Sequence, residues 1–580
     1  MRDATRERLL AEETGAVRKS WRNRIPIALL YPNRYAVGMS NLGFQAVYRL
    51  LNAFADVVCE RAFLPEEDDP CEAPLLTLES GRPVAAAEVV AFSLSFENDA
   101  LNLVRMLSRS GIAPLAAARR ADDPLVVGGG VALSLNPEAL APLVDCVLLG
   151  EAECTVPAFV EALRAEKDRN ARLRLLARSV PGAYVPAFYR VAYGASGEIA
   201  GREPLAEAPE RIRSPVCADL ACRSPLSSAV LTPHSVFGRS VLIETGRGCS
   251  RGCRFCSAGF LYRPPRMHAA ESLAEAVAAA ADRLPHVGLV GAAVSDHPAV
   301  DSLCSRFAAR GVHFSFSSLR ADTLSPERLA ALRESGVKTA TVAPEAGSER
   351  LRRLIRKGLT EEQILAAASE LVAAGIPNLK LYFMIGLPTE TREDAAEIAS
   401  LVKRIRHEFL RSSRGRGAIG TLTVSVNAFV PKPVTPFQWA AMAETAELKA
   451  RLALLERELR RVPNVRLHAD VPRWAYIQAL LARGDRRVGE LLLRVHAAGG
   501  NWRRALRQSV LNADWFVLRE RPAEEILPWD FIDHPVSRDY LRQEYERALA
   551  GRAGPDCRPG AGCEVCGACP ALQAGEGAEA

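Results

Sequence analysis

The sequence predicts an α/β protein with a doubly wound, Rossmann-like N-terminal domain, a partial six-stranded β/α barrel and a helical C-terminal region. Short apolar runs alternate with amphipathic helical segments in two separate stretches, and this alternation is typical of parallel sheets covered by helices. The alternation stops between residues 181 and 235, where the pattern is poor. It resumes near residue 240, so we expect two sheet-containing domains in the 580-residue chain.

The composition is that of a globular protein. Hydrophobic residues make up 48% and charged residues 24%, with a net charge of +6, which excludes wholesale disorder and collagen-like repeats. No apolar run is long enough for a transmembrane helix, and the charged N-terminus lacks the apolar core of a secretory signal. We therefore expect a cytoplasmic protein with no membrane partner, where clustered cysteines indicate metal or redox chemistry.

The expected organisation follows the two alternating stretches. The domain boundaries are an N-terminal helix at 1–20, an α/β domain at 21–180, a linker with short strands at 181–235, a barrel at 236–440, a helical domain at 441–550 and a Cys-rich tail at 551–580. In the first domain we expect strands at 26–31, 88–95, 124–129 and 144–149, with helices at 44–55, 99–110 and 156–166. In the barrel we expect strands at 240–245, 286–291, 312–317, 339–343, 379–385 and 421–426, with helices at 270–284, 299–310, 325–335, 361–374 and 391–410. Beyond the barrel we expect a helix at 442–462 and a strand-like segment at 465–471.

Three of the fourteen cysteines form the most informative motif. Cys249, Cys253 and Cys256 have CxxxCxxC spacing within GRGCSRGCRFCSAG, directly after the first barrel strand. Three thiolates on one Gly-rich loop can each bind one iron of a cubane cluster and leave the fourth iron open. Structural zinc sites usually take four protein ligands, so three fit zinc less well. Barrel active sites lie at the carboxyl ends of the strands, and the motif therefore predicts a catalytic cluster.

This motif, after the first strand of a six-stranded β/α barrel, resembles the radical S-adenosylmethionine (radical SAM) superfamily. The resemblance implies a 4Fe-4S cluster on Cys249, Cys253 and Cys256 and SAM bound to the open iron through its amino and carboxylate groups. It implies one electron from a flavodoxin- or ferredoxin-type donor. That electron cleaves SAM to methionine and a 5′-deoxyadenosyl radical.

The resemblance also implies contacts to SAM. Phe255 matches the aromatic residue near adenine, and Glu345, at the end of the fourth strand, matches a polar contact to the ribose. Met384 and Gly386, in MIGLP, match the segment that lines adenine.

For two further contacts to SAM, the sequence allows more than one assignment. Ser317 and Arg320 are expected near the SAM carboxylate or ribose, although Arg320 has an alternative as a structural partner of Glu345. The superfamily's GGE segment is replaced by GAAVSDHP at 291–298, so backbone near Gly291, or Asp296, would take over the contact to the amino group.

The first domain resembles the cobalamin-binding class of radical SAM proteins. The matching segments are YPNRYAVGMSNLG, SLSFEN, VVGGGVALSLNPE and LLGEAE, and a glycine triplet lets a flat corrin approach the backbone closely. All nine histidines lie at residue 234 or later, so this domain offers no histidine ligand to cobalt. The alternative is a dinucleotide-type or empty α/β domain. The cobalamin contacts implied by the resemblance are Asn33, Gly38, Ser93, Ser95, Gly128, Gly129, Gly130 and Glu151.

The tail contains a second cysteine group. Cys557, Cys563, Cys566 and Cys569 have CxxxxxCxxCxxC spacing, and four thiolates hold either zinc or a second iron–sulfur cluster. Together with segments around 425–439 and 527–549, the resemblance covers most of the chain and points to an uncharacterised subgroup.

The sequence thus predicts a radical SAM enzyme for cobalamin-dependent methylation of an unactivated carbon. One alternative is a radical SAM enzyme with a non-binding cobalamin domain that modifies RNA, protein or a small molecule without methyl transfer. Another is a non-catalytic iron–sulfur or cobalamin-binding protein. Basic residues near Lys403 and Arg404 suit either an RNA-binding face or a solvated helix face, so RNA is one of several open substrate classes.

Overall fold

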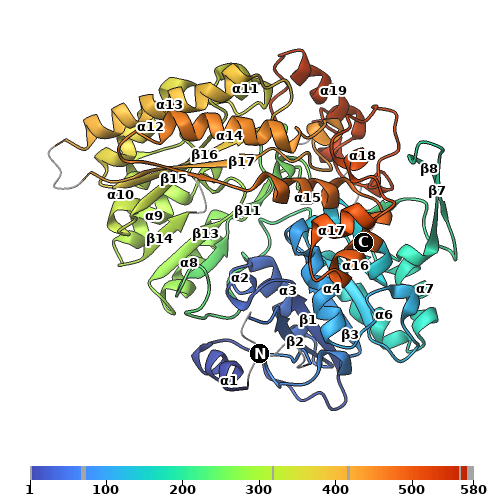
Figure 1. The fold of residues 1–580 in the computed structure, drawn as a ribbon. Helices are drawn as coiled ribbons and strands as arrows, with labels where there is room; N and C mark the ends of the chain where they lie inside the picture. Colours follow the sequence, from blue (N-terminus) through green and yellow to red (C-terminus); the bar gives the residue numbers. More distant parts are fainter. Residues whose placement is uncertain are drawn as a thin grey trace.

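A computed structural model describes residues 3–66, 74–316, 319–414, 419–558, 560 and 563–570. Two parallel sheet systems and a set of C-terminal helices make up the molecule (Figure 1). The α/β class predicted from the sequence is confirmed. In the described part of the chain, no helix combines the length and the apolar character needed to cross a bilayer.

The N-terminal sheet has the strand order β2-β1-β3-β4-β5-β6, with β1 to β5 parallel and β6 antiparallel. Alternate residues of β1 face two different cores: Ile27 and Leu29 pack with α3, α6 and α7, whereas Ala28 and Leu30 pack with α4. Helices therefore cover both faces of the sheet. The strands are β1 (Ile25–Tyr31), β2 (Val57–Phe63), β3 (Val89–Ser93), β4 (Leu125–Gly129), β5 (Cys146–Leu148) and β6 (Ala183–Tyr184). The helices are α1 (Asp3–Glu12), α2 (Tyr35–Gly38), α3 (Leu42–Ala53), α4 (Ala100–Arg109), α5 (Val131–Leu135), α6 (Ala152–Ala165) and α7 (Arg169–Ser179).

Strand β2 is absent from the sequence prediction. Its seven residues are all buried, yet Glu60 and Arg61 interrupt the apolar run that would have marked a strand. Arg61 forms ion pairs of 2.6 Å with both Glu13 and Glu79, and all three side chains are essentially inaccessible. The ion pairs lower the free-energy cost of burying these charges. This pairing cannot be predicted from the local sequence pattern around the strand.

The second system contains two parallel sheets, β10-β13-β14 and β15-β16-β17-β18. An isolated parallel bridge between Leu319 and Val342 links the segment after β14 to β15. A strand lies at each of the six expected positions, and β18 adds one more strand to the second of these sheets. The strands are β10 (Val241–Glu244), β13 (His286–Val290), β14 (His313–Phe316), β15 (Thr339–Glu345), β16 (Asn378–Ile385), β17 (Leu422–Ala428) and β18 (Val465–Ala469). The helices are α8 (Ala270–Ala281), α9 (Val300–Ala308), α10 (Pro326–Glu334), α11 (Glu349–Leu354), α12 (Glu361–Ala373) and α13 (Arg392–Ser412).

Short strands occupy the linker, and helices follow the barrel. The linker strands are β7 (Tyr189–Tyr193), β8 (Ile199–Pro204) and β9 (Ile212–Arg213), and β9 pairs with β19 (Ile532–Asp533). The C-terminal helices are α14 (Thr445–Leu459), α15 (Pro472–Arg483), α16 (Arg487–Ala497), α17 (Trp502–Gln508), α18 (Ala513–Val517) and α19 (Arg538–Leu549).

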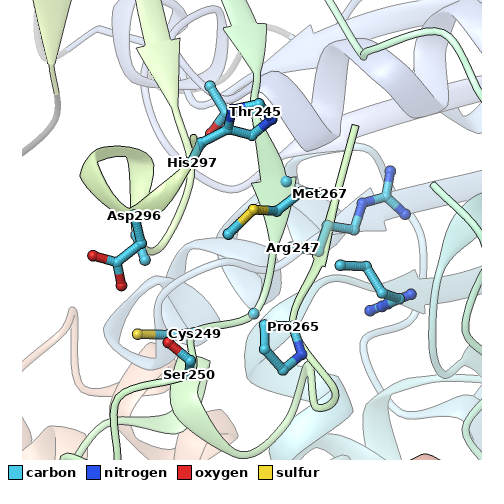
Figure 2. A pocket seen from close by; sticks show the side chains of 12 residues that line it. Thr245, Arg247, Cys249, Ser250, Pro265, Met267, Asp296 and His297 are labelled. Carbon is cyan, nitrogen blue, oxygen red and sulfur yellow. The ribbon is translucent and has the colours of Figure 1, made fainter. Parts of the chain in front are cut away.

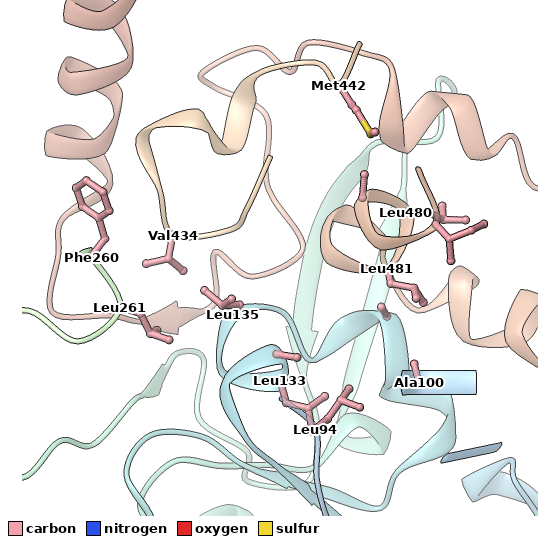
Figure 3. Close-up of a cluster of buried hydrophobic side chains, with 14 of the residues drawn as sticks. Leu94, Ala100, Leu133, Leu135, Phe260, Leu261, Val434, Met442, Leu480 and Leu481 are labelled. Carbon is pink, nitrogen blue, oxygen red and sulfur yellow. The ribbon is translucent and has the colours of Figure 1, made fainter. Parts of the chain in front are cut away.

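One hydrophobic core runs through both sheet systems. Figure 3 shows Leu94 and Leu133 of the N-terminal domain below Leu480 and Leu481 of α15, and all four belong to one buried cluster. Phe260 from the cysteine loop and Val434 from the loop after β17 are in the same cluster. Helix α16 also packs against α4. Because this core is shared, the carboxyl edge of the N-terminal sheet is held in a fixed position beside the barrel.

Candidate functional site

The cysteine motif lies on a loop that a small hairpin closes. Strand β11 (Gly246–Arg247) pairs antiparallel with β12 (Arg266–Met267), and the intervening residues contain Cys249, Cys253 and Cys256. Gly248 at the start of this loop has φ +82°, and a Cβ there would lie 2.3 Å from the carbonyl oxygen of Tyr262. Only glycine fits this position, so the loop geometry depends on it.

The three thiols influence one another electrostatically. Burial raises the pKa of Cys249, and burial together with the neighbouring Cys253 raises the pKa of Cys256 to about 11. The amide N–H of Arg251 donates to the Sγ of Cys249 over 3.4 Å. The raised pKa values favour neutral thiols in the absence of a metal ion, so a bound cation would be needed to hold these groups as thiolates.

The donor set fits a cluster better than a single ion. A tetrahedral zinc site with bonds of about 2.3 Å places its sulfurs about 3.8 Å apart. Among the described residues, the one group of three metal-ligand side chains with donor atoms within 4.8 Å is Glu151, Glu153 and Cys217. The sulfurs of the cysteine loop are therefore spread more widely than one zinc ion requires, as several bridging irons would need.

A pocket beside Cys249 is lined by the hairpin and by the segment after β13. Figure 2 shows Cys249 and Asp296 on the same side of this pocket, with Thr245, Met267 and His297 around it. Gly291 lies at the end of β13, where a Cβ would come within 2.7 Å of the Thr245 Oγ1. The residues expected near the SAM amino group are thus brought next to the first cluster cysteine.

Arg251 organises the charges around this pocket. It lies between Cys249 and Cys253 and forms ion pairs with Asp296 (3.0 Å) and Asp322 (3.3 Å). Arg320 pairs with Asp322 at 2.9 Å, so the alternative expectation that it pairs with Glu345 is wrong. Sequence reasoning missed Arg251 and Asp322, because nothing in their local spacing distinguishes them from surface charges.

Glu345 ends β15 in an unusual backbone conformation. Its φ is +70°, which is rare for a residue other than glycine and is found mainly where function requires it. The Nζ of Lys357 lies 3.1 Å from its carboxylate, a partner that sequence reasoning did not identify. Burial raises the pKa of Glu345, and Lys357 offsets this only in part. Ser317, expected nearby, lies outside the described residues.

The two residues expected near adenine come together. Phe255 and Met384 are far apart in sequence, but both pack against one buried apolar cluster. Gly386 has φ +82°, and a Cβ there would lie 2.7 Å from Leu448 Cδ2, so packing alone requires this glycine. The cluster contains Ala346, Leu351, Leu354, Ile355, Leu387, Phe429, Phe437, Ala440 and Ala548.

In the N-terminal domain, Ser93 and the glycine triplet line a mainly apolar cavity of about 80 Å³. The cavity lies between the ends of β1, β3, β4 and β5 and helices α3 and α6. A Cβ on Gly128 or Gly130 would clash with neighbours at 2.7 Å or less, whereas on Gly129 the nearest atom is 3.8 Å away. Only Gly129 therefore leaves open space beside the strand ends.

The other residues expected to contact cobalamin lie in loops of the same sheet edge. Asn33 donates from Nδ2 to Asp99 over 3.0 Å, and burial raises the pKa of Asp99 to about 6. Ser95 accepts from the Asn41 Nδ2 over 3.0 Å. Gly38 allows α2 to pack on β2, because a Cβ there would meet the Phe63 ring at 2.5 Å.

Glu151 connects the two halves of the site. Its carboxylate pairs with Arg266 (2.8 Å) and Arg247 (2.7 Å), which are the residues of the hairpin that closes the cysteine loop. Burial opposes ionisation, but these two guanidinium groups lower the pKa of Glu151. The carboxyl edge of the N-terminal sheet thus faces the cysteine loop across an ion-pair network.

Basic side chains on α13 have acidic partners. Lys403 lies 3.1 Å from Glu458, and Arg404 lies 2.5 Å from Glu361. This pairing is typical of a solvated helix face.

Two family descriptions match the chain. Residues 43–186 match "Radical SAM proteins, N-terminal", and residues 243–402 match "Radical SAM superfamily". The cysteine loop, Glu345 and Met384 all lie in the second region.

Among characterised and uncharacterised relatives, the uncharacterised protein MJ0966 of Methanocaldococcus jannaschii is 28% identical over 470 residues, covering 80% of this chain and 90% of that protein. The threonylcarbamoyladenosine tRNA methylthiotransferase MtaB of Treponema pallidum is 27% identical over 39% of this chain and 49% of its own length.

The solved structures are more distant. TsrM of Kitasatospora setae, a radical SAM methyltransferase, has a TM-score of 0.43 and 14% identity, over 69% of this chain and 72% of that one. OxsB, a cobalamin-dependent radical SAM enzyme, has a TM-score of 0.42 and 16% identity over 65% of this chain. The matched part spans about half (52%) of the OxsB chain.

Proposed function

This chain is a radical SAM enzyme, and we propose that it uses cobalamin to methylate an unactivated carbon of its substrate. Cys249, Cys253 and Cys256 would hold the 4Fe-4S cluster. When bound, the cluster supplies the electron that cleaves SAM to the 5′-deoxyadenosyl radical. Around it, Glu345 would accept hydrogen bonds from the ribose, and Phe255 and Met384 would exclude water from the adenine.

One relationship carries the cobalamin part of the proposal. The cavity lined by Ser93 and Gly129 opens at the sheet edge whose Glu151 is ion-paired to the cysteine-loop hairpin. A cofactor with its nucleotide portion in that cavity would present its other end toward the loop. Apolar walls with a few polar atoms at a sheet's carboxyl edge are typical of a cofactor site.

The N-terminal domain would hold the cofactor without a histidine on cobalt. All nine histidines lie at residue 234 or later. We propose that polar residues at this edge, among them the half-buried Asn33 and the buried Asp99, orient the cofactor instead. The substrate would enter between this edge and the barrel mouth.

The test is a binding and product experiment on the full chain. The protein is purified anaerobically, given hydroxocobalamin, freed of excess and examined by corrin absorption with an iron count. Retained corrin in a 1:1 ratio, together with a methylated product and 5′-deoxyadenosine, supports the proposal. Iron without corrin overturns methyl transfer and favours a radical SAM enzyme that modifies RNA, protein or a small molecule without it.

A further inference from the structure

The tail cysteines have a spacing that separates iron–sulfur sites from zinc sites. Cys563, Cys566 and Cys569 form a C-x₂-C-x₂-C run followed by Pro570, and Cys557 precedes it. Such runs on one short loop are typical of 4Fe-4S ligands. Structural zinc sites instead use two ligand pairs separated by a longer segment.

The structure places the tail cysteines beside the rings that flank Arg263. Cys566 is buried in the same apolar cluster as Phe260 and Tyr540, and the Arg263 guanidinium lies 4.9 Å and 5.6 Å from the centroids of those two rings. Cys557, Cys563 and Cys569 are half-buried. The four cysteines span thirteen positions of the chain.

Arg263 is a buried cation that lacks a carboxylate partner. It is 1% exposed, and its Nη1 donates to the Tyr540 hydroxyl over 3.3 Å. Its Nε and Nη2 have no hydrogen-bond partner within the described ranges, and no ion pair to it occurs there. The rings of Phe260 and Tyr540 contact the guanidinium, but neither supplies a full negative charge. A buried cation without an anion is costly, so a negative centre is expected beside it.

The tail is attached to the back of the cysteine loop. Arg254, which follows Cys253, donates from Nη2 to the carbonyl oxygen of Arg552 over 2.8 Å. The amide N–H of Ser537, at the start of α19, donates to the carbonyl oxygen of Cys566 over 2.9 Å. These contacts hold both ends of the cysteine group in place.

We propose that Cys557, Cys563, Cys566 and Cys569 hold a second 4Fe-4S cluster, whose net negative charge is balanced by Arg263. Four protein thiolates occupy all four irons, so this cluster would have no open position for SAM. The site is independent of the cobalamin proposal, since it uses neither the N-terminal cavity nor the barrel mouth.

The test removes one cysteine group at a time from the full chain. The wild type, a core variant (Cys249→Ala, Cys253→Ala, Cys256→Ala) and a tail variant (Cys563→Ala, Cys566→Ala) are reconstituted anaerobically with iron and sulfide. Iron and acid-labile sulfide are counted, and the reduced proteins are examined by electron paramagnetic resonance. We expect about eight irons in the wild type and about four in each variant.

Two results would overturn the proposal. One is a folded core variant that binds no iron, and the other is a core variant that binds one zinc per chain in place of iron. The core variant leaves the tail intact, so it decides the question even where the tail variant fails to fold. Corrin binding and SAM cleavage are not read out, so failure here is distinct from failure of the proposed function.

A separate measurement, the midpoint potential of the tail cluster, tests the charge-balancing role of Arg263. In the core-variant background, Arg263→Met removes the buried charge and keeps most of the side-chain volume. We expect the midpoint potential of the tail cluster to fall, because reduction adds negative charge beside a site that has lost its cation. Arg120→Met, at a side chain that is 84% exposed, is the matched control. An unchanged potential in Arg263→Met contradicts the charge-balancing role.

Discussion

The Oε1 atom of Glu151 lies 2.8 Å from the Nη2 atom of Arg266, so a residue at the start of α6 is ion-paired to the strand that closes the cysteine loop. Arg247, on the opposite strand of the hairpin, contacts the other oxygen of the same carboxylate at 2.7 Å. Both strands of the hairpin therefore contact one carboxylate of the N-terminal domain, and Arg247 also pairs with Glu153 of that domain at 2.6 Å. These contacts tie the cysteine loop to the carboxyl edge of the N-terminal sheet.

Glu151→Gln is expected to destabilise the protein by about 3 kcal/mol at neutral pH, since it leaves the buried guanidinium of Arg266 without its anion. Arg247 loses one partner but keeps Glu153 and Glu244. The folded-state pKa of Glu151 is lowered, so its contribution is present above the unfolded-state pKa and is lost as the pH falls below about 4. Chemical denaturation of the apoprotein at several pH values measures this.

The matched control for that variant is Glu203→Gln, whose side chain is 61% exposed in its pair with Arg190. We expect a change of at most about 0.5 kcal/mol there. Equal effects of the two variants would show that the Glu151 network does not hold the domains together.

Cys253→Ala is expected to abolish SAM cleavage, because a cubane held by two thiolates is not retained. Anaerobic assays for 5′-deoxyadenosine, combined with iron counts, measure the loss. Cys222→Ala, at an exposed cysteine, is the control and should keep full activity. Deoxyadenosine formation at the wild-type rate in Cys253→Ala would exclude the cysteine loop as the catalytic site.

Glu345→Gln is expected to raise the KM for SAM about tenfold or more with unchanged iron content, as a charged acceptor for the ribose is lost. Because burial raises the pKa of Glu345, its carboxylate is protonated at a higher pH than an exposed glutamate. The wild-type KM should therefore rise on acidification while the pH is still above the ordinary glutamate pKa of about 4.3. Glu345→Gln should lack this pH dependence, and a parallel rise in both proteins would argue against the ribose contact.

Gly129→Leu is expected to abolish corrin retention without unfolding the protein. Its Cβ begins in open space, and the added side chain would fill the cavity beside Ser93. Absorption spectra after removal of excess hydroxocobalamin give the bound fraction. Gly201→Leu, at a strand position with nothing within 4 Å of the added Cβ, is the control. Full corrin binding in Gly129→Leu would place the cofactor elsewhere or exclude it.

Local spacing was sufficient for most of the fold and for the choice of candidate site residues. The alternating apolar runs located the six expected strands of the second sheet system. The CxxxCxxC motif predicts Cys249, Cys253 and Cys256 as cluster ligands, and this stays a prediction. Such features are readable because ligand spacing and strand periodicity are properties of neighbouring residues. The extra strand β18 was also marked by its own alternating pattern.

The pairing of charged residues that are far apart in the sequence could be determined only from the tertiary structure. In strand β2, Arg61 is buried in ion pairs with Glu13 and Glu79. In the barrel region, Arg320 forms its ion pair with Asp322 and not with Glu345. The sequence also gives no sign that Arg263, near the tail cysteines, lacks a carboxylate partner among the described residues. The partner of a charged residue cannot be predicted from its local sequence, because the pair forms only when distant segments of the chain pack together and exclude water from both side chains. The tertiary structure therefore determines which charges are paired, which are left for a cofactor, and how the two domains meet.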